Sequence, residues 1–387
     1  MVSERLSQLS PSPTLEITAK AKALRAQGVD VIGFGAGEPD FDTPQHIKDA
    51  LYQAVEDGFI YYTPSPGIPE LREAIAEKLK RDNKIDYAVD EVIVTPGAKQ
   101  ALFEAVMALV NPGDEVLIPA PYWVSYVPMC QIAGARAVAV PTAMEHGFRV
   151  SAKDLASQIT EKTRLLILNS PSNPTGAVVD RKGLSEIADL CIKEDIIVIS
   201  DEIYEHMIYD AEHVSIGSLP EMRERTVTVN GFSKAYSMTG WRLGYAAAPK
   251  GIIKPMSNLQ GHSVSNATSF VQKAGVAALR ESQDCVVEMT AEFRRRRDRI
   301  VELLNEIPGV ECPRPDGAFY VFADFSSVEP DSVKFAGILL DEAGVAVVPG
   351  VAFGDAGEGF LRLSYATSME KIEEGIARIN KVVRRIV

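Results

Sequence analysis

The chain has 387 residues, of which 46% are hydrophobic and 24% charged, and it carries a formal net charge of −13. These fractions are near the averages of soluble globular proteins and exclude a disordered, collagenous or fibrous chain, while the acidic excess disfavours nucleic acid and anionic membranes as partners. No apolar run reaches the ~18 residues that span a bilayer and no secretory signal is visible, so we expect a cytoplasmic protein of two to three domains.

Short β-branched runs alternate with amphipathic helices along most of the chain. We predict helices at 15–27, 99–110 and 184–194, and strands at 91–95, 115–118, 137–140, 165–168, 196–199, 226–229 and 244–247. Strands that are apolar throughout and separated by helices predict an α/β fold with a mostly parallel seven-stranded sheet that is covered on both faces. We expect this large domain to occupy residues 46–280. Thr43 and Pro44 predict a helix N-cap followed by proline at the first helical position.

The C-terminal part has a different pattern and predicts a smaller α+β domain, formed by residues 281–387 together with the N-terminal segment 1–45. We predict a long helix at 286–306, strands at 318–322, 345–348 and 360–364, and a last helix. A capping box at 367–370 would begin that helix. Its apolar face comprises Ile372, Ile376, Ile379 and Val383.

Two other features have ordinary explanations. The four cysteines, Cys130, Cys191, Cys285 and Cys312, are widely separated and form no C-x-x-C motif, so we expect reduced thiols rather than zinc ligands or disulfides. The run of four arginines at 294–297 lies among apolar residues at helical spacing, which favours a solvated helix face over a nucleic-acid contact.

Ligands of open α/β sheets bind beyond the carboxyl ends of the strands, so the residues that follow each strand are candidates for a site. The small residues at 95–98 open a helix and suit a phosphate, although no P-loop motif is present. Asn173 lies in a stiff loop with two prolines and a glycine and offers a side-chain amide. Asp201 ends an apolar strand, where a carboxylate requires a cation or donors. A metal site of Asp201, Glu202, Glu205 and His206 is the alternative that we disfavour.

The segment after the strand at 226–229 is the richest in reactive groups. Lys234 lies among small and aromatic residues, and burial makes a lysine amine nucleophilic toward aldehydes. Arg242 can hold a phosphate in a bidentate fork. Arg362 lies between apolar neighbours and needs an anionic partner, either a ligand carboxylate or a structural aspartate. The early G-x-G-x-G at 33–37 does not lead into a helix, which argues against a dinucleotide site.

Taken together, these segments resemble the fold-type I, class I/II aminotransferases that use pyridoxal 5′-phosphate. The resemblance covers almost the whole chain. Its carriers are residues 35–41 (GAGEPDF), 62–64 (YTP) with 67–72 (GIPELR), 121–123 (PYW), 173–176 (NPTG), 201–204 (DEIY), 233–244 and 362–364 (RLS). The details are most similar to the bacterial and archaeal aspartate aminotransferase subgroup, some members of which also act on prephenate.

The resemblance implies a role for each matching residue. Lys234 would bind the cofactor covalently, Asp201 would pair with its ring nitrogen, Tyr204 and Asn173 would hydrogen-bond its ring oxygen, and Trp123 would stack on the ring. The phosphate would be held by Ala98, Ser233 and Arg242, with Tyr62 from a partner subunit, and Lys99 is a further candidate. Arg362, Asn173 and the backbone of Gly37 would bind the substrate α-carboxylate. Lys99, with Thr14, would bind a distal carboxylate, or Lys99 would bind phosphate or face solvent.

The roles imply ping-pong kinetics, and the resemblance implies an aminotransferase that moves an amino group between L-aspartate and 2-oxoglutarate and works as a homodimer with active sites at the subunit interface. Prephenate, which some members of the subgroup use, is left open as a further substrate. Lys234, Asp201 and Tyr204 would be the catalytic residues of the enzyme, and no metal is expected. Three different functions stay open: an aromatic or broad-specificity aminotransferase, a hydrolase with a Ser233/Lys234 dyad, and a non-catalytic regulator that reuses the fold.

Overall fold

The structure, a computed structural model, describes residues 7, 9 and 13–387. Its largest element is a seven-stranded sheet in the order β2-β8-β7-β6-β5-β3-β4. The strands are β2 (Val92–Thr95), β3 (Glu115–Ala120), β4 (Arg136–Pro141), β5 (Thr163–Asn169), β6 (Ile197–Asp201), β7 (Thr226–Gly231) and β8 (Gly244–Ala247). All neighbouring pairs are parallel except those that involve β8, which is antiparallel to β2 and β7. The mostly parallel sheet of fold type I is therefore confirmed.

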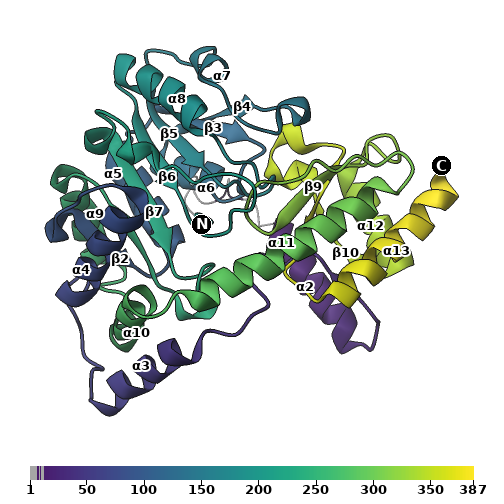
Figure 1. Cartoon of the computed structure of the whole chain (residues 1–387). Helices are drawn as coiled ribbons and strands as arrows, with labels where there is room; N and C mark the ends of the chain where they lie inside the picture. Colours follow the sequence, from purple (N-terminus) through teal and green to yellow (C-terminus); the bar gives the residue numbers. More distant parts are fainter. Residues whose placement is uncertain (1–6, 8, 10–12) are drawn as a thin grey trace.

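The central strands are buried on both faces because helices cover each side of the sheet (Figure 1). The covering helices are α4 (Pro69–Lys78), α5 (Ala98–Leu109), α6 (Tyr126–Ala133), α7 (Ala152–Ala156), α8 (Arg181–Lys193), α9 (Lys250–Ser263) and α10 (Ser269–Arg280). Helix α3 (Gln45–Glu56) packs on α10 and projects away from the sheet. Because successive side chains of a strand point to opposite faces, Leu165 and Ile167 pack with α5 and α6, while Leu166 and Leu168 pack with α8.

The C-terminal region packs three helices against a small antiparallel sheet of order β11-β12-β9. The helices are α11 (Asp284–Asn305), α12 (Ser332–Ala343) and α13 (Met369–Ile386), and the strands are β9 (Tyr320–Asp324), β11 (Val348–Pro349) and β12 (Phe360–Ser364). Helix α11 runs from beside α10 to the C-terminal region (Figure 1). The predicted elements of this part are confirmed, within a few residues at their ends.

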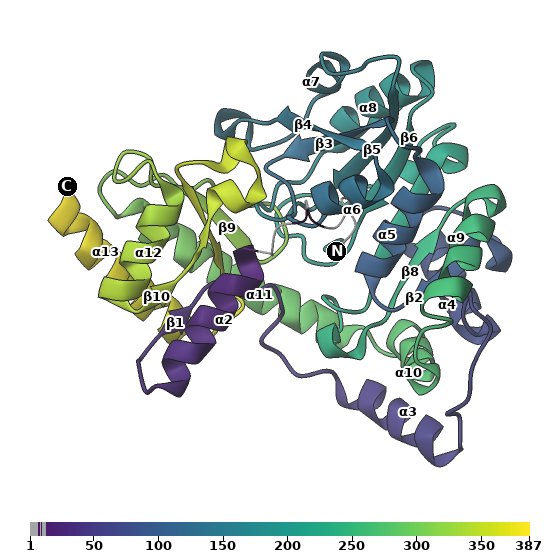
Figure 2. The same cartoon turned by 180° about the vertical axis from the view of Figure 1, so that it is seen from behind.

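The N-terminal segment packs against the C-terminal region, as Figure 2 shows from behind. Strand β1 (Ile32–Gly33) pairs in parallel with β10 (Val345–Ala346), and helix α2 (Pro13–Ala26) precedes it. Ala21 and Val31 form a small core with Leu340 and Ala346. Residues from the two ends of the chain are therefore part of one packed unit.

Two local expectations about helix caps were wrong. Thr43 does not cap helix α3, because its hydroxyl donates instead to the carbonyl of Ser237 at 2.7 Å, and Pro44 is the N-cap. The cap of α13 is Ser368 rather than Thr367, because the helix begins at Met369 and the Ser368 hydroxyl accepts from the amide of Lys371. A capping pattern in sequence does not by itself decide which of two adjacent hydroxyls meets the helix.

The expectation for the arginine run was also wrong for half of its members. Arg294 and Arg295 are exposed, but the side chains of Arg296 and Arg297 are 8% and 0% exposed. Helix α11 has neighbours on more than one side, so its buried stripe is wider than the apolar spacing indicates. Arg296 pairs with Asp40 and Glu292, which replaces the hydration that its guanidinium loses.

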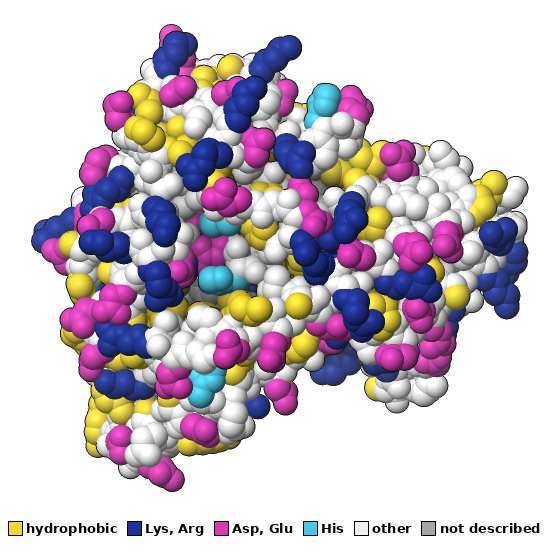
Figure 3. All heavy atoms as spheres, viewed as in Figure 1, with side chains coloured by type: hydrophobic (Ala, Val, Ile, Leu, Met, Phe, Trp, Pro, Cys, Tyr) yellow, Lys and Arg dark blue, Asp and Glu magenta, His cyan; other side chains and the backbone are white. Residues whose placement is uncertain are grey.

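The distribution of surface charge agrees with the composition. Basic and acidic side chains are interspersed over the face in Figure 3, without a continuous basic stripe. All four cysteines are free, as expected, and burial raises the pKa of Cys130 and Cys191 to about 12. Among the helices of residues 13–387, none combines the length and the apolarity needed to cross a membrane.

Candidate active site

A cavity of about 460 Å³ lies at the carboxyl ends of the parallel strands, between the sheet and the C-terminal region. Its walls come from the turns after β1, β5, β6 and β7, the first turn of α5, and strands β9 and β12. Most residues that the sequence predicts for the site line it: Gly37, Ala98, Lys99, Trp123, Asn173, Asp201, Tyr204, Ser233, Lys234, Arg242 and Arg362. The structure thus brings together side chains that are up to 325 positions apart in the sequence, from Gly37 to Arg362.

Lys234 lies in the turn after β7 and points its ammonium group across the cavity. Its Nζ donates to the carbonyl of Gly37, and it lies 5.9 Å and 5.7 Å from the ring centroids of Tyr204 and Phe319. Burial lowers the pKa of Lys234 to about 8, an effect to which the positive charges of Arg362 and Arg242 add. The lowered pKa makes the unprotonated amine, which a nucleophile toward a carbonyl carbon requires, more abundant near neutral pH than in an exposed lysine.

Asp201 ends strand β6 and is 4% exposed. The hydroxyl of Tyr126 donates to its Oδ2 at 2.6 Å, and the amide of Ile203 lies 3.3 Å from its Oδ1. Burial raises the pKa of Asp201 to about 6, against the opposing effect of these two donors. The described residues place no cation within ion-pair distance of Asp201, so a protonated nitrogen of a bound ligand would be a favourable partner.

Arg362, in strand β12, is 2% exposed and is held by neutral acceptors only. Its Nη1 donates to Oδ1 of Asn173 at 3.1 Å and its Nη2 to the carbonyl of Gly35 at 2.8 Å. Its Nε is buried without a hydrogen-bond partner. Among the side chains that the structure describes, no carboxylate lies within ion-pair distance of this guanidinium. Of the two partners that the sequence left open, the structure therefore favours a ligand carboxylate over a structural aspartate.

Aromatic rings hold this arginine in place. The guanidinium carbon of Arg362 lies 4.4 Å from the ring centroid of Tyr320 and 5.1 Å from that of Phe353. The hydroxyls of Tyr320 and Tyr204 are 3.0 Å apart. Tyr320 thus connects the predicted carboxylate-binding residue to Tyr204.

The first turn of α5 has features that suit a second anion. Gly97, at φ +87°, precedes Ala98, and no side chain caps the helix, so its amide groups are available to a ligand. Arg242 donates to the carbonyl of Thr239 at 3.0 Å and packs so closely on Gly97 that an added Cβ would lie 2.5 Å from its Nη2. The helix dipole and this guanidinium together favour a doubly charged group such as phosphate.

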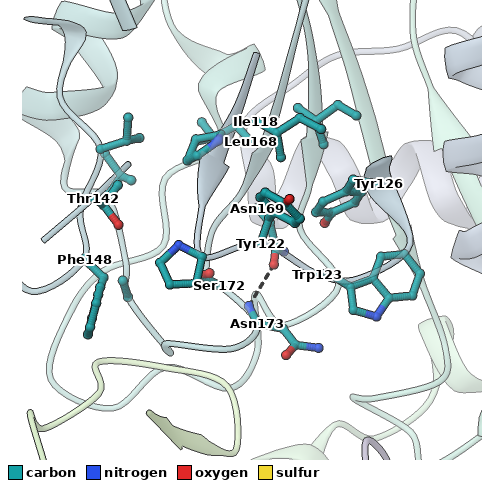
Figure 4. Close-up of a pocket in the computed structure, with 16 residues that line it drawn as sticks. Ile118, Tyr122, Trp123, Tyr126, Thr142, Phe148, Leu168, Asn169, Ser172 and Asn173 are labelled. Atoms are coloured by element: carbon teal, nitrogen blue, oxygen red, sulfur yellow. Dashed lines mark hydrogen bonds between the residues drawn. The ribbon is translucent and has the colours of Figure 1, made fainter. Parts of the chain in front are cut away.

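Lys99 also belongs to this first turn of α5, and its side chain lies over Trp123 in the wall of the cavity. The Nζ of Lys99 lies 4.9 Å from the ring centroid of Trp123, and burial lowers the pKa of Lys99. Figure 4 shows Trp123, Tyr126, Asn169 and Asn173 around a smaller cavity of about 30 Å³ that adjoins the main one, with Asn169 accepting from the amide of Asn173. The two asparagines are thereby tied together at the end of β5.

Two predicted site residues are not among those that line the cavity in the described part of the chain, for different reasons. Tyr62 is 89% exposed and does not line it. The side chain of Thr14 lies outside the described residues, although its backbone belongs to α2. The peptide bonds Ala120–Pro121, Ser170–Pro171 and Asn173–Pro174 are cis.

Sequence reasoning missed four residues that line the cavity. Asn169 ends a strand and donates to the Asp201 carbonyl at 2.9 Å, so its position alone could have drawn attention to it. Tyr126 lies three residues after Trp123, at the start of α6, which is a weaker signal. Glu38 lines the cavity and accepts from Thr239 at 2.8 Å. Tyr320 has no local signal, because only the tertiary fold brings β9 to the cavity.

The residues of the cavity suit pyridoxal 5′-phosphate. The group needs an amine for its aldehyde, an anion for its ring nitrogen and a cationic cradle for its phosphate. Lys234, Asp201 and the Gly97–Arg242 cradle have these properties, and the unpaired Nε of Arg362 leaves capacity for a substrate carboxylate.

Comparison with known proteins agrees with this geometry. The family model "Aminotransferase class I and II" matches residues 29–379. The chain is 52% identical to a probable aspartate/prephenate aminotransferase of Aquifex aeolicus, over 100% of this chain and 99% of that one. Its structure is similar to that of the Thermus thermophilus aspartate aminotransferase with maleate (TM-score 0.95, 46% identity, 99% of each chain) and to that of an aromatic aminotransferase from Pyrococcus horikoshii (TM-score 0.91, 49% identity, 94% of this chain and 100% of that one). The chain belongs to the class I and II aminotransferase family.

Proposed function

We propose that the protein is a pyridoxal 5′-phosphate-dependent aminotransferase that exchanges the amino group between L-aspartate and 2-oxoglutarate and also accepts prephenate. One observation carries this proposal: a single cavity contains a lysine of lowered pKa, a buried carboxylate without a cation and a buried arginine without an anion. The printed names of several relatives, among them aspartate and aspartate/prephenate aminotransferases, support the choice of substrates.

The residues that would hold the cofactor follow from the donors of the cavity. Lys234 would bind it covalently, Asp201 would face its ring nitrogen, and Tyr204 and Asn173 its ring oxygen. Trp123 would cover the ring, and Ala98, Ser233 and Arg242 would hold the phosphate, with Lys99 at the edge of this cradle. When bound, the cofactor supplies an electron sink for charge that develops at the substrate Cα.

The protein's own groups then bind, orient and move protons. Arg362 and Asn173 would fix the α-carboxylate, with the backbone of Gly37 beside it, so that the Cα–H bond points at Lys234. The Nζ of Lys234 would take the Cα proton as a general base and deliver it as a general acid, a role that a pKa of about 8 suits. Asp201 would keep the ring nitrogen protonated, and Tyr204 would hold the ring oxygen.

Preference for an acidic substrate requires a second cation for the distal carboxylate. We propose Lys99 for this role, with Thr14 from the N-terminal segment. The Nζ of Lys99 lies over Trp123 at the cavity wall and makes no ion pair with any carboxylate in the described part of the chain. Contact of Lys99 with the cofactor phosphate is the competing role.

We also propose that the enzyme is a homodimer in which Tyr62 of one subunit reaches the phosphate of the other. Tyr62 and its neighbour Tyr61 are 89% and 80% exposed, which is unusual for tyrosines of a folded chain without a partner. Within each subunit, residues 46–280 would form the cofactor domain, and residues 1–45 with 281–387 the second domain. The pairing of β1 with β10 supports this grouping.

A panel of amino donors and acceptors with the purified holoenzyme tests the proposal. We expect the highest kcat/KM for aspartate and glutamate, with prephenate as a further acceptor, and parallel double-reciprocal plots. No measurable rate with either acidic amino acid would reject the substrate assignment, and a higher kcat/KM for phenylalanine would favour an aromatic aminotransferase.

Two further measurements address the role of Lys99 and the class of protein. Lys99→Met should lower kcat/KM for aspartate about tenfold or more but leave phenylalanine nearly unaffected, whereas a phosphate role would weaken cofactor binding for both substrates. A Ser233/Lys234 hydrolase or a non-catalytic regulator predicts no visible absorbance that responds to an amino donor.

A further inference from the structure

A buried polar cluster lies next to the active-site segment, on the side of helix α4. It comprises Lys78, Asn83, Ser200, Glu202, Glu205, His213, Ser215 and Asn230. Acidic and histidine side chains gather near the middle of the face shown in Figure 3. The side chains of Glu202, Glu205 and Lys78 are 1%, 5% and 2% exposed, so charged groups of both signs are withdrawn from water here.

Glu202 is completely satisfied by neighbouring groups. Its Oε1 accepts from the hydroxyls of Ser200 at 2.8 Å and Ser215 at 2.6 Å. Its Oε2 accepts from Nδ2 of Asn83 at 2.8 Å and lies 2.9 Å from Nε2 of His213. Four hydrogen-bond partners fix the position of this carboxylate.

Glu205 is paired with the ammonium group of Lys78. It also accepts from the amides of Asn83 and Asn230, each at 2.7 Å. Ligand atoms of Glu202, Glu205 and His213 lie within 4.8 Å of one another, a spacing that suits a metal ion, but Lys78 donates into this group. Lys78 thus places a positive charge next to Glu205, where a metal ion would otherwise be expected.

The cluster is joined to the active site through a five-residue segment. Asp201 and Tyr204 line the cavity, whereas Glu202 and Glu205 enter the cluster. The amide of Glu202 donates to the carbonyl of Val229 at 2.9 Å, which fixes the segment against β7. The charges of Glu202 and Lys78 act through a poorly solvated interior, where their fields are weakly screened.

We propose that Glu202 and Lys78 are positioning residues for the reaction and that their charges have opposite effects. The cluster holds residues 201–205 in place, and its charges set how tightly the titratable groups in the cavity hold their protons. The inference rests on the proposed function, because the cofactor on Lys234 is the reporter. The negative charge of Glu202 adds to burial in raising the pKa of Asp201. Glu205, His206, His213 and Asp82 also face the cluster.

The test is a pH titration, from pH 5 to 9, of the visible absorbance of the holoenzyme. Glu202→Gln removes a negative charge that attracts protons, so the midpoint of this absorbance titration should fall by about half a pH unit to one pH unit. Lys78→Gln removes a repelling positive charge, so the midpoint should rise by a similar amount. The Lys78→Gln/Glu202→Gln double variant should return close to the wild-type midpoint.

A merely structural role predicts a different pattern. Loss of packing alone would move the midpoints of both single variants in the same direction, with the largest shift in the double variant, and this outcome would overturn the proposal, as would unchanged midpoints. Glu70→Gln is the matched control. It changes the net charge as Glu202→Gln does, but at an exposed position of α4, the helix that also contains Lys78, and it should leave the midpoint unchanged.

Two controls keep the result interpretable. If Lys78→Gln does not fold, Lys78→Arg retains the charge and should keep the wild-type midpoint, whereas Glu202→Gln should still lower it. Failure of the proposed function is seen in the wild-type protein, which would then carry no titratable chromophore on Lys234. A wild-type protein that titrates normally while both single variants match it rejects the inference alone.

Discussion

Two buried arginines, one in the active site and one outside it, differ in whether they are paired with carboxylates. Arg297 in α11 is fully buried and pairs with Asp210 at 2.7 Å and Asp298 at 2.8 Å. Arg362 in β12 is equally buried but contacts only neutral oxygens and two aromatic rings. Because an unpaired buried charge is costly, its persistence indicates a ligand that supplies the opposite charge. The structural arginine is thus paired with carboxylates inside the protein, whereas the active-site arginine has no internal anion and can pair with a substrate.

The largest effect is expected at Lys234, whose amine has no charged partner of its own in the described chain. Lys234→Ala removes both the covalent attachment and the proton carrier, so the transamination rate should fall by about 10³-fold or more. Steady-state rates with aspartate and 2-oxoglutarate measure this, and borohydride reduction followed by peptide mass analysis should find the cofactor on Lys234. Lys254→Ala, at an exposed position of α9, is the control. A variant that retains a tenth of the wild-type rate would contradict the assignment.

The comparison of the two arginines is tested directly by the same substitution at both positions. Arg362→Met should lower kcat/KM about 100-fold or more, mainly through KM, without loss of stability, because no internal ion pair is broken. Arg297→Met should leave kcat/KM within about threefold but lower the free energy of unfolding by about 1–3 kcal/mol, because Asp210 and Asp298 each lose one of their arginine partners.

Substrate kinetics and denaturant unfolding of both variants provide the measurement. If Arg362→Met destabilises the protein as much as Arg297→Met does, the distinction between paired and unpaired charges is wrong.

Asp201 is a buried acidic group that, like Arg362, has no oppositely charged partner within ion-pair distance in the described chain. Asp201 has a pKa of about 6 in the folded chain against 3.8 when exposed, so ionisation is unfavourable in the cofactor-free protein. A raised carboxyl pKa means that its contribution to stability is present at low pH and is lost as the pH rises from about 4 through 6, by about 3 kcal/mol in all. Asp201→Asn should therefore stabilise the cofactor-free protein above pH 7 and have no effect near pH 4.

Urea unfolding of the cofactor-free wild type and variant across this pH range measures the difference. Equal stability of the two at pH 8 would show that Asp201 is not strained by burial. The holoenzyme should behave in the opposite way, because the protonated ring nitrogen then compensates the carboxylate, and Asp201→Asn should weaken its activity.

The features that could be predicted from sequence share one physical origin. Parallel strands end at a common edge, so Asn173, Asp201 and Lys234 could be assigned to one site from the ends of separate strands. The burial of Arg297 and the contact of Tyr320 with Arg362 could not, because both depend on how the C-terminal region packs against the sheet. Helical periodicity identified one buried face of α11, but it carries no information about a second neighbour.

The smallest effect concerns Tyr320, which the sequence did not indicate. Its ring lies 4.4 Å from the guanidinium of Arg362 and its hydroxyl 3.0 Å from that of Tyr204, so one side chain serves two functions that substitutions can separate. Tyr320→Phe keeps the ring and removes one hydrogen bond, so kcat should fall about 2- to 10-fold with little change in KM for aspartate. Tyr320→Leu also removes the ring that holds Arg362, so KM should rise as well. If both variants raise KM equally, the hydroxyl rather than the ring positions the arginine, and the cation–π contact contributes nothing to substrate binding.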